Sequence, residues 1–258
     1  MARFAANLTM LFTEVPFIER FGQASKAGFK AVEFLFPYEY EAELLTEQLN
    51  THQLEQALFN MPPGDWAAGE RGIAALPDRI DEFEQSVDIA LHYAQALGCK
   101  KVHAMAGLLS PDFSVEAHRE TFIRNLRYAA DRFAAHGISV MIEPLNSRDV
   151  PGYFVAHQRD AVALIKAIDR PNVKLQFDVY HAQIMDGDLS VLIKEVADYI
   201  GHVQIASVPY RHEPDEGEVN YPFLFGELGK SGYQDWIGCE YNPRQGTLEG
   251  LGWVTPYL

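Results

Sequence analysis

The 258-residue sequence has only two cysteines, Cys99 and Cys239, and no apolar run that approaches the length of a membrane span. Two cysteines cannot form a disulfide framework, and their separation is unlike that of a metal-binding pair. A membrane-spanning helix needs about 20 consecutive apolar residues. The first ten residues, MARFAANLTM, also lack the apolar segment of a signal peptide. We therefore expect a cytoplasmic protein with no membrane partner.

Positive charge is scarce as well. The chain has 21 basic and 36 acidic residues, which gives a formal net charge of −15. Such a surface repels polyphosphate, so we expect no nucleic-acid partner. Nucleotide motifs are also missing. No G-x-G-x-x-G follows the first apolar segment, and the sequence Gly229-Lys230-Ser231 has Leu224 where a P-loop needs its first glycine. An anionic substrate would need local positive charge from a metal or a placed arginine.

What the sequence does contain is a β-type run followed by an amphipathic helical stretch, repeated along the chain. Residues 114–136 illustrate the helical part, with an apolar stripe, Ser114 as a plausible N-cap and Gly137 just past the end. Eight such units predict a parallel sheet closed into a (β/α)8 TIM barrel, a single α/β domain spanning residues 1–258. The predicted strands are residues 3–9, 31–36, 54–61, 101–106, 139–144, 173–178, 202–206 and 236–241.

Polar side chains stand at or near the ends of the last four predicted strands. They are Glu143, Asp178, Gln204 and Glu240, separated by 35, 26 and 36 residues, each about one βα unit. In a parallel barrel the carboxyl ends of the strands face the mouth where active sites form. These four side chains are therefore expected to converge on one site.

Three converging carboxylates would repel one another and lose hydration, and a bound divalent cation offsets both costs. Three carboxylates and an amide oxygen form an all-oxygen ligand set, which favours Mg²⁺ or Mn²⁺ over zinc. Gln204 is the weakest member, because a glutamine inside a strand can simply satisfy a neighbouring backbone group. His181, three residues after Asp178, is either a group near the substrate or a packed histidine, and His103 on the fourth strand reads as packing.

Long segments of the chain resemble the hydroxypyruvate isomerase family, within the xylose-isomerase-like TIM barrels and including 2-oxo-tetronate isomerases. The resemblance extends over essentially the whole chain and is carried by FAANLTMLF, VEFLFPYEY, PPGDWAAGERGIAALP, IEPLN, VYHAQ, HVQIA, RHEPDEGEVNY, WIGCEY and GLGW. It implies a metal-assisted aldose–ketose isomerase that interconverts hydroxypyruvate and tartronate semialdehyde (2-hydroxy-3-oxopropanoate) through an enediolate.

The resemblance also implies roles for single residues. Glu143, Asp178, Gln204 and Glu240 would hold the metal, and Glu143 and Glu240 would be the catalytic acid/base pair. His181 and Arg211 would bind a small hydroxy or oxo acid, with Arg211 able to pair with its carboxylate. A metal that polarises both substrate oxygens would stabilise the enediolate, while one carboxylate removes a proton and the same or a second one returns it.

Residues 62–77 form a long Gly-containing loop after the third strand, with Trp66, Glu70 and Arg71. Such a loop at a barrel mouth is either a lid over the active site or an ordinary surface excursion. Substrate length stays open, because FTEVPFIERF resembles 2-oxo-tetronate isomerases and the tryptophan loop resembles hydroxypyruvate isomerases.

Other functions on the same scaffold are a ketose 3-epimerase, a metal-dependent DNA repair nuclease and a non-catalytic sugar-binding barrel. The net charge of −15 disfavours the nuclease, and retention of the metal-ligand pattern disfavours the non-catalytic barrel. The sequence leaves the oligomeric state open, a homo-oligomer included.

Overall fold

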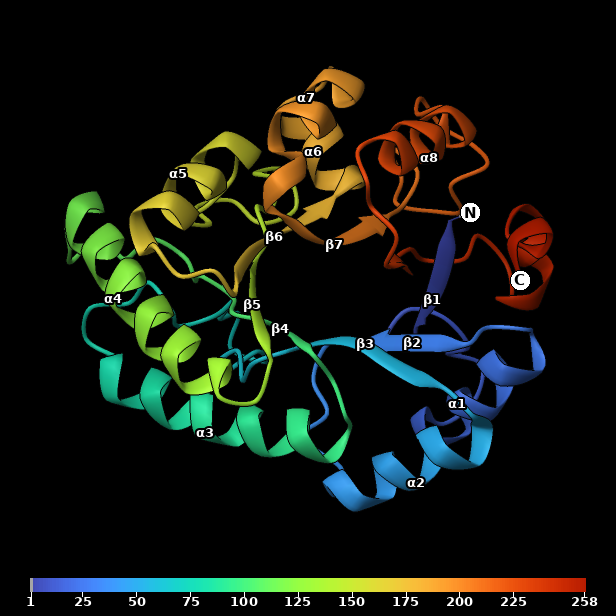
Figure 1. The fold of residues 1–258 in the computed structure, drawn as a ribbon, viewed down its shortest axis with the longest axis horizontal. Helices are drawn as coiled ribbons and strands as arrows, with labels where there is room; N and C mark the ends of the chain where they lie inside the picture. Colours follow the sequence, from blue (N-terminus) through green and yellow to red (C-terminus); the bar gives the residue numbers. More distant parts are fainter. Residues whose placement is uncertain (1) are drawn as a thin grey trace.

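In the computed structural model, which describes residues 2–258, eight parallel strands form a closed barrel in sequence order. Helices surround the barrel, as Figure 1 shows. This confirms the predicted (β/α)8 TIM barrel. The strands are β1 (Arg3–Asn7), β2 (Ala31–Phe34), β3 (Glu55–Asn60), β4 (Lys101–His103), β5 (Ser139–Ile142), β6 (Val173–Asp178), β7 (Ile200–Ile205) and β8 (Trp236–Cys239).

The helices follow the strands as the sequence periodicity predicts. They are α1 (Phe17–Lys26), α2 (Ala42–His52), α3 (Ile80–Ala96), α4 (Val115–Ala134), α5 (Gln158–Ile168), α6 (Val179–Met185), α7 (Leu189–Val196) and α8 (Tyr221–Lys230), with 3-10 turns η1 (Ala197–Tyr199), η2 (Leu248–Trp253) and η3 (Thr255–Tyr257). Ser114 caps α4 by accepting a hydrogen bond from the Ala117 amide at 3.1 Å. None of these helices is long and apolar enough to cross a membrane.

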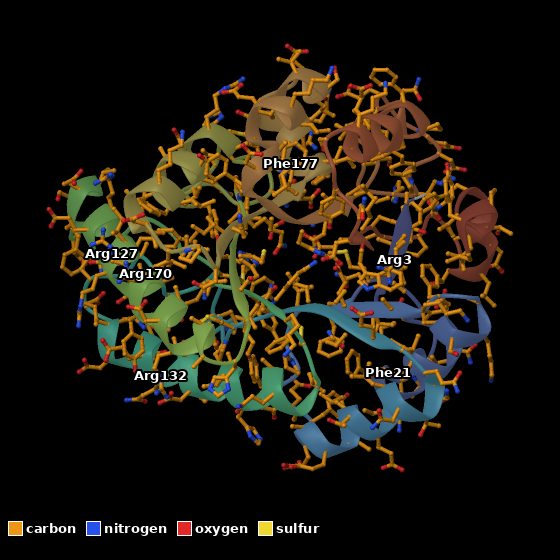
Figure 2. All side chains as sticks on the ribbon, in the orientation of Figure 1. Arg3, Phe21, Arg127, Arg132, Arg170 and Phe177 are labelled. Atoms are coloured by element: carbon orange, nitrogen blue, oxygen red, sulfur yellow. The ribbon has the colours of Figure 1, made fainter. Side chains whose placement is uncertain are left out.

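Most predicted strands run past the observed carboxyl ends, because the chain turns there into the loops that build the barrel mouth. Strand β6 shows how the two strand faces divide. Phe177 points outward into the apolar layer between strands and helices (Figure 2). Gln176 and Asp178 occupy the opposite face, as strand alternation requires. The charged Arg127, Arg132 and Arg170 lie on the outer rim of the helical ring (Figure 2).

After β8 the chain forms the short turns η2 and η3 rather than a long helix. Their aromatic rings pack edge-to-face on the strand β1 side chain Phe4, with centroid distances of 5.1 Å to Trp253 and 5.2 Å to Tyr257. In Figure 1 these turns lie beside β1, near the amino terminus. The C-terminal turns thus cover the barrel beside β1, and the loops that follow the strands form the barrel mouth.

Candidate active site and metal centre

The structure brings the four predicted ligands to one end of the barrel. Glu143 directly follows β5, Asp178 ends β6, Gln204 lies in β7 and Glu240 directly follows β8. Asp178 and Gln204 are opposite each other in the β6–β7 register. All four are buried, with exposed fractions of 6, 0, 1 and 7% in that order.

A cavity of about 230 Å³ opens at this end. Its walls include Glu143, Glu240, His181 and Arg211, so four of the predicted site residues share one space. Asp178 and Gln204 are buried and are not among the residues that line the cavity. The carboxylate oxygens of Glu143 and Asp178 and a ring nitrogen of His181 all lie within 4.8 Å of one another, a spacing that could hold one ion.

Burial disfavours the charged forms of these carboxylates, and so does the repulsion between them. Burial raises the pKa of Glu143 well above its ordinary value, and the neighbouring Glu240 and Asp178 raise it further. Burial likewise raises the pKa of Glu240 to about 8 and that of Asp178 to about 6. Glu143 Oε1 and Asp178 Oδ2 are buried with no hydrogen-bond partner among residues 2–258. Two free buried oxygens on neighbouring strand ends fit an oxygen-seeking divalent cation such as Mg²⁺ or Mn²⁺.

Gln204 is oriented by Glu33, a fully buried residue of β2. Its amide Nε2 donates to Glu33 Oε1 at 2.8 Å, so its carbonyl Oε1 faces the other way. That oxygen accepts from Gln176 Nε2 at 2.6 Å, and the same nitrogen lies 2.9 Å from Glu143 Oε2. Gln176 thus bridges the Gln204 carbonyl oxygen and Glu143, and a ligand role for Gln204 would require this oxygen to leave Gln176 for the cation.

The hydrogen bonds of His181 fix which ring nitrogen carries its proton. The backbone N–H of Asn146 donates to His181 Nδ1 at 3.1 Å, and the Asn146 side-chain amide donates to the same nitrogen at 2.7 Å. A nitrogen that accepts cannot hold the proton, so a neutral His181 carries it on Nε2. Burial, with Arg211 and His103 nearby, lowers the pKa of His181 well below its ordinary value, which keeps it neutral.

The Nε2 of His181 lies 3.8 Å from Glu143 Oε1 and 3.7 Å from Asp178 Oδ2. A protonated Nε2 in this place is a hydrogen-bond donor and not a metal ligand. The tautomer therefore favours the substrate-side role predicted for His181 over a ligand role.

Arg211 reaches the cavity from the loop after β7 and is held by the carboxylates. Its Nη2 donates to Glu240 Oε2 at 2.6 Å and lies 3.8 Å from Asp178 Oδ2. The residue has a left-handed backbone with φ of 58°, and its carbonyl oxygen accepts the Asn242 amide at 2.8 Å. This hydrogen bond ties the β7 loop to the loop after β8.

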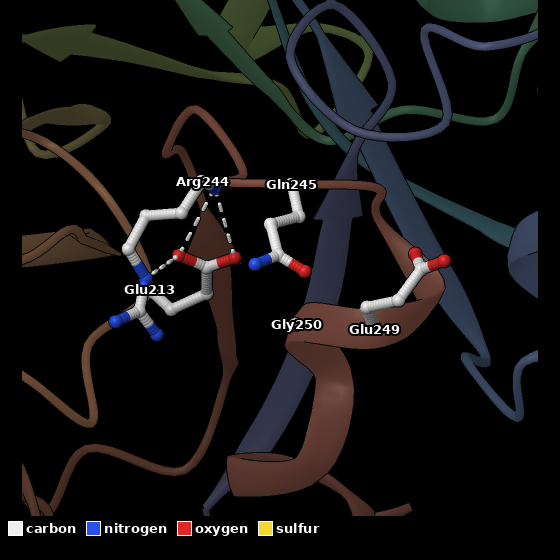
Figure 3. Close-up of a pocket in the computed structure, with 5 residues that line it drawn as sticks. All are labelled: Glu213, Arg244, Gln245, Glu249 and Gly250. Atoms are coloured by element: carbon white, nitrogen blue, oxygen red, sulfur yellow. Dashed lines mark hydrogen bonds and ion pairs between the residues drawn. The ribbon is translucent and has the colours of Figure 1, made fainter.

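A second contact between the loops after β7 and β8, here called the Glu213 clamp, lies at the edge of a separate pocket, drawn in Figure 3. The buried carboxylate of Glu213 accepts the backbone N–H of Arg244 at 3.2 Å and its guanidinium Nε at 2.9 Å. Because Glu213 is two residues after Arg211, this clamp helps to set where the Arg211 side chain enters the cavity.

The loop of residues 62–77 forms part of the cavity rim. Trp66 and Arg71 line the cavity, whereas Glu70 turns away to pair with Arg79 at 2.5 Å and to accept the Asp65 amide at 2.6 Å. The backbone of Gly72 pairs with that of Ala106 in an isolated bridge. Glu70 thus stabilises the loop from within, and Trp66 and Arg71 are the loop residues that face the cavity.

Several polar residues of the site were not singled out in the sequence. Glu33 and Asn7 extend the network to Glu240, because Asn7 Nδ2 donates to Glu33 at 3.0 Å and to Glu240 Oε1 at 3.3 Å. His202 Nε2 lies 2.7 Å from Glu33. His103, expected as packing, has Nδ1 3.3 Å from Glu143 Oε2. Glu33 could have been recognised from the sequence, because it places a charged residue in the otherwise apolar strand AVEF.

Comparison with known proteins supplies the family. The family described as xylose isomerase-like TIM barrel matches residues 21–257. The chain belongs to this family. A 2-oxo-tetronate isomerase from Pectobacterium atrosepticum is 56% identical over 100% of this chain and 98% of its own length. The hydroxypyruvate isomerase of Escherichia coli is 47% identical, with both chains covered completely.

Among solved structures, a Brucella melitensis protein named AP endonuclease, family 2 is 60% identical, covers 100% of this chain and 99% of its own, and superposes with a TM-score of 0.98. Within the xylose isomerase-like family, the full-length curated relatives above carry isomerase names. These matches identify the chain as an isomerase of this family and confirm the resemblance stated from the sequence.

Proposed function

We propose that this chain is a metal-assisted isomerase of short 2-oxo sugar acids, in which the carbonyl moves between C2 and C3 through an enediolate. The observation that carries the proposal is the shared cavity of Glu143, Glu240, His181 and Arg211 at the carboxyl ends of the strands. Glu143, Asp178, Gln204 and Glu240 would hold the divalent cation. When bound, the cation would polarise the adjacent carbonyl and hydroxyl oxygens of the substrate.

The protein's own residues supply the proton transfers. Glu143 Oε1 accepts no hydrogen bond among residues 2–258, whereas Oε2 accepts from Gln176, so Oε1 is the oxygen of this carboxylate that is free to face the substrate or the cation. Both oxygens of Glu240 accept hydrogen bonds, one from Asn7 and one from Arg211, and these two bonds fix the position of its carboxylate. One carboxylate would remove the proton from C3 and one would return a proton at C2, while the proton of the C3 hydroxyl passes to the C2 oxygen, so that substrate and product have the same atoms. The Nε2–H of His181 would donate to a substrate oxygen.

Two substrates have the required arrangement. Hydroxypyruvate and a 2-oxo-tetronate both carry a carboxylate at C1, a carbonyl at C2 and a hydroxyl at C3, so one constellation serves both. The higher identity to a relative named 2-oxo-tetronate isomerase supports the four-carbon acid, and the relative named hydroxypyruvate isomerase supports the three-carbon acid. A panel of both acids with a neutral ketose, tested on Mg²⁺- and Mn²⁺-loaded protein, distinguishes them by product.

The endonuclease name of the Brucella melitensis protein raises a nuclease as a second candidate. The net charge of −15 disfavours it, because a DNA backbone is bound through basic side chains. Incubation with duplex DNA that contains an abasic site decides the matter. Strand cleavage together with inactivity on every sugar acid would refute the isomerase proposal, as would isomerase activity that survives complete chelation of metal.

A further inference from the structure

The cavity wall contains two arginines in contrasting surroundings, Arg71 and Arg211. Arg211 lies against Glu240 and Asp178, and these carboxylates offset its charge. Arg71 forms no ion pair with any carboxylate in the part of the chain that the structure describes. Within that part, its only hydrogen bonds run from Nη1 to the carbonyl oxygens of Glu70 and Trp66, at 2.7 and 3.3 Å. Arg71 thus offers the cavity a positive charge that no described carboxylate offsets.

Arg71 is also held in place. Its guanidinium lies 4.0 Å from the centroid of the Trp66 ring, and that ring packs edge-on against Phe36 with centroids 5.0 Å apart. The next residue, Gly72, has φ of 107°, and a Cβ there would overlap the backbone of Met105. The loop backbone is thus pressed against the chain that follows β4. A guanidinium that is held on an aromatic ring beside a fixed backbone is positioned to bind a planar anion such as a carboxylate.

The cavity needs such a group if its substrate is an acid. Glu143, Glu240 and the buried Asp178 are acidic, and the whole protein carries a charge of −15. A substrate carboxylate entering this field is repelled unless a cation receives it. Nε and Nη2 of Arg71 make no hydrogen bond among residues 2–258, so an edge of the guanidinium is free to bind both oxygens of a carboxylate.

We propose that Arg71 binds the C1 carboxylate of the substrate and makes the site selective for 2-oxo acids over neutral ketoses. The inference rests on the proposed function and deepens it. Arg211, which the sequence suggested for this role, would then act beside Glu240 near the reacting carbons. Trp66 would serve as the platform that keeps the Arg71 guanidinium flat.

The test compares wild type with Arg71→Met in Mn²⁺-containing buffer, using calorimetry and tryptophan fluorescence to measure binding. The probes are hydroxypyruvate and the neutral dihydroxyacetone, which differs from it only at the carboxyl end. We expect affinity for hydroxypyruvate to fall at least tenfold in Arg71→Met, affinity for dihydroxyacetone to stay within twofold, and Arg71→Lys to recover part of the loss. Arg124→Met is the matched control, because it removes one positive charge from an exposed α4 side chain remote from the cavity lining.

Hydroxypyruvate should also change the fluorescence of wild type, and Trp66→Phe should abolish that change while Trp236 and Trp253 remain. Equal hydroxypyruvate affinity in wild type and a folded Arg71→Met would overturn the role of Arg71 and leave the isomerase proposal intact. Arg71-dependent binding of the acid without any turnover in wild type would overturn the isomerase proposal and leave the carboxylate contact standing. Failure of wild type to bind the acid would refute both.

Discussion

Replacing Glu33 probes the network on which the site is built. Its carboxylate accepts hydrogen bonds from Asn7 Nδ2 at 3.0 Å and Gln204 Nε2 at 2.8 Å, and lies 2.7 Å from His202 Nε2. Glu33→Ala leaves Gln204 Nε2 and His202 Nε2 buried without their acceptor, whereas Asn7 Nδ2 keeps Glu240 Oε1 at 3.3 Å. At about 1–3 kcal/mol for each of these two orphaned donors, the free energy of unfolding should fall by roughly 2–6 kcal/mol. That is a large part of the roughly 5–15 kcal/mol typical of a folded domain.

Glu33→Gln keeps the volume and one acceptor oxygen. The new amide would face His202, which can change tautomer because its Nδ1 has no hydrogen-bond partner within residues 2–258. We therefore expect a loss of only about 1–3 kcal/mol for Gln. In Glu33→Ala, which removes the acceptor that orients Gln204, affinity for Mn²⁺ should fall roughly 10- to 100-fold, whereas Glu33→Gln keeps an acceptor oxygen for Gln204 and should stay closer to wild type.

Urea unfolding of the metal-free protein and calorimetric titration with Mn²⁺ measure the two effects. The control is Glu55→Ala, which removes an exposed carboxylate from the start of β3 and should change stability by less than about 0.5 kcal/mol. A Glu33→Ala protein with wild-type stability and wild-type Mn²⁺ affinity would show that the network neither stabilises the barrel nor positions Gln204.

Four further outcomes follow from the same geometry. Glu143→Gln and Glu240→Gln should each lower kcat by about 10²–10⁴ without unfolding the protein, and near-normal turnover in either would remove it from the acid/base role. Gly238→Ala should cost about 1–3 kcal/mol in urea unfolding, because its methyl group would overlap the Glu33 carboxylate; unchanged stability would mean the contact is loose. Arg244→Ala should lower kcat about 10- to 100-fold by releasing the β7 loop, with circular dichroism unchanged, and full activity would contradict the clamp. The metal-free protein should lose stability as pH rises from about 5 to about 8, because the raised pKa of Glu240 lets the folded state bind more protons than the unfolded state in that range; metal should abolish this slope, and a flat melting profile without metal would refute it.

The periodicity of the sequence predicted the alternation of strands and helices, and the count of eight units favoured the closed barrel that the structure shows. Helix α4 begins after its predicted cap at Ser114, and β6 has the predicted bounds of residues 173–178. Strand ends were less predictable, because residues such as Glu143 and Glu240 have strand-like neighbours in sequence but leave the ladder to enter the mouth.

The site was predictable only in part, for a physical reason. The strand-end polar groups are visible in sequence because four successive units each carry one, three carboxylates and the amide of Gln204. Partnerships across the barrel are not, since Asn7 and Glu240 are 233 positions apart. The tautomer of His181 depends on hydrogen bonds from the backbone N–H and the side-chain amide of Asn146, which no residue pattern specifies.

A crystal structure of the protein grown with Mn²⁺, with anomalous scattering recorded at the manganese edge, tests the metal site most directly. We predict a single strong peak at the barrel mouth, coordinated by oxygens of Glu143, Asp178, Gln204 and Glu240, with His181 Nε2 outside the coordination sphere. No peak among these side chains, or a peak coordinated by His181 in place of Gln204, would contradict the account.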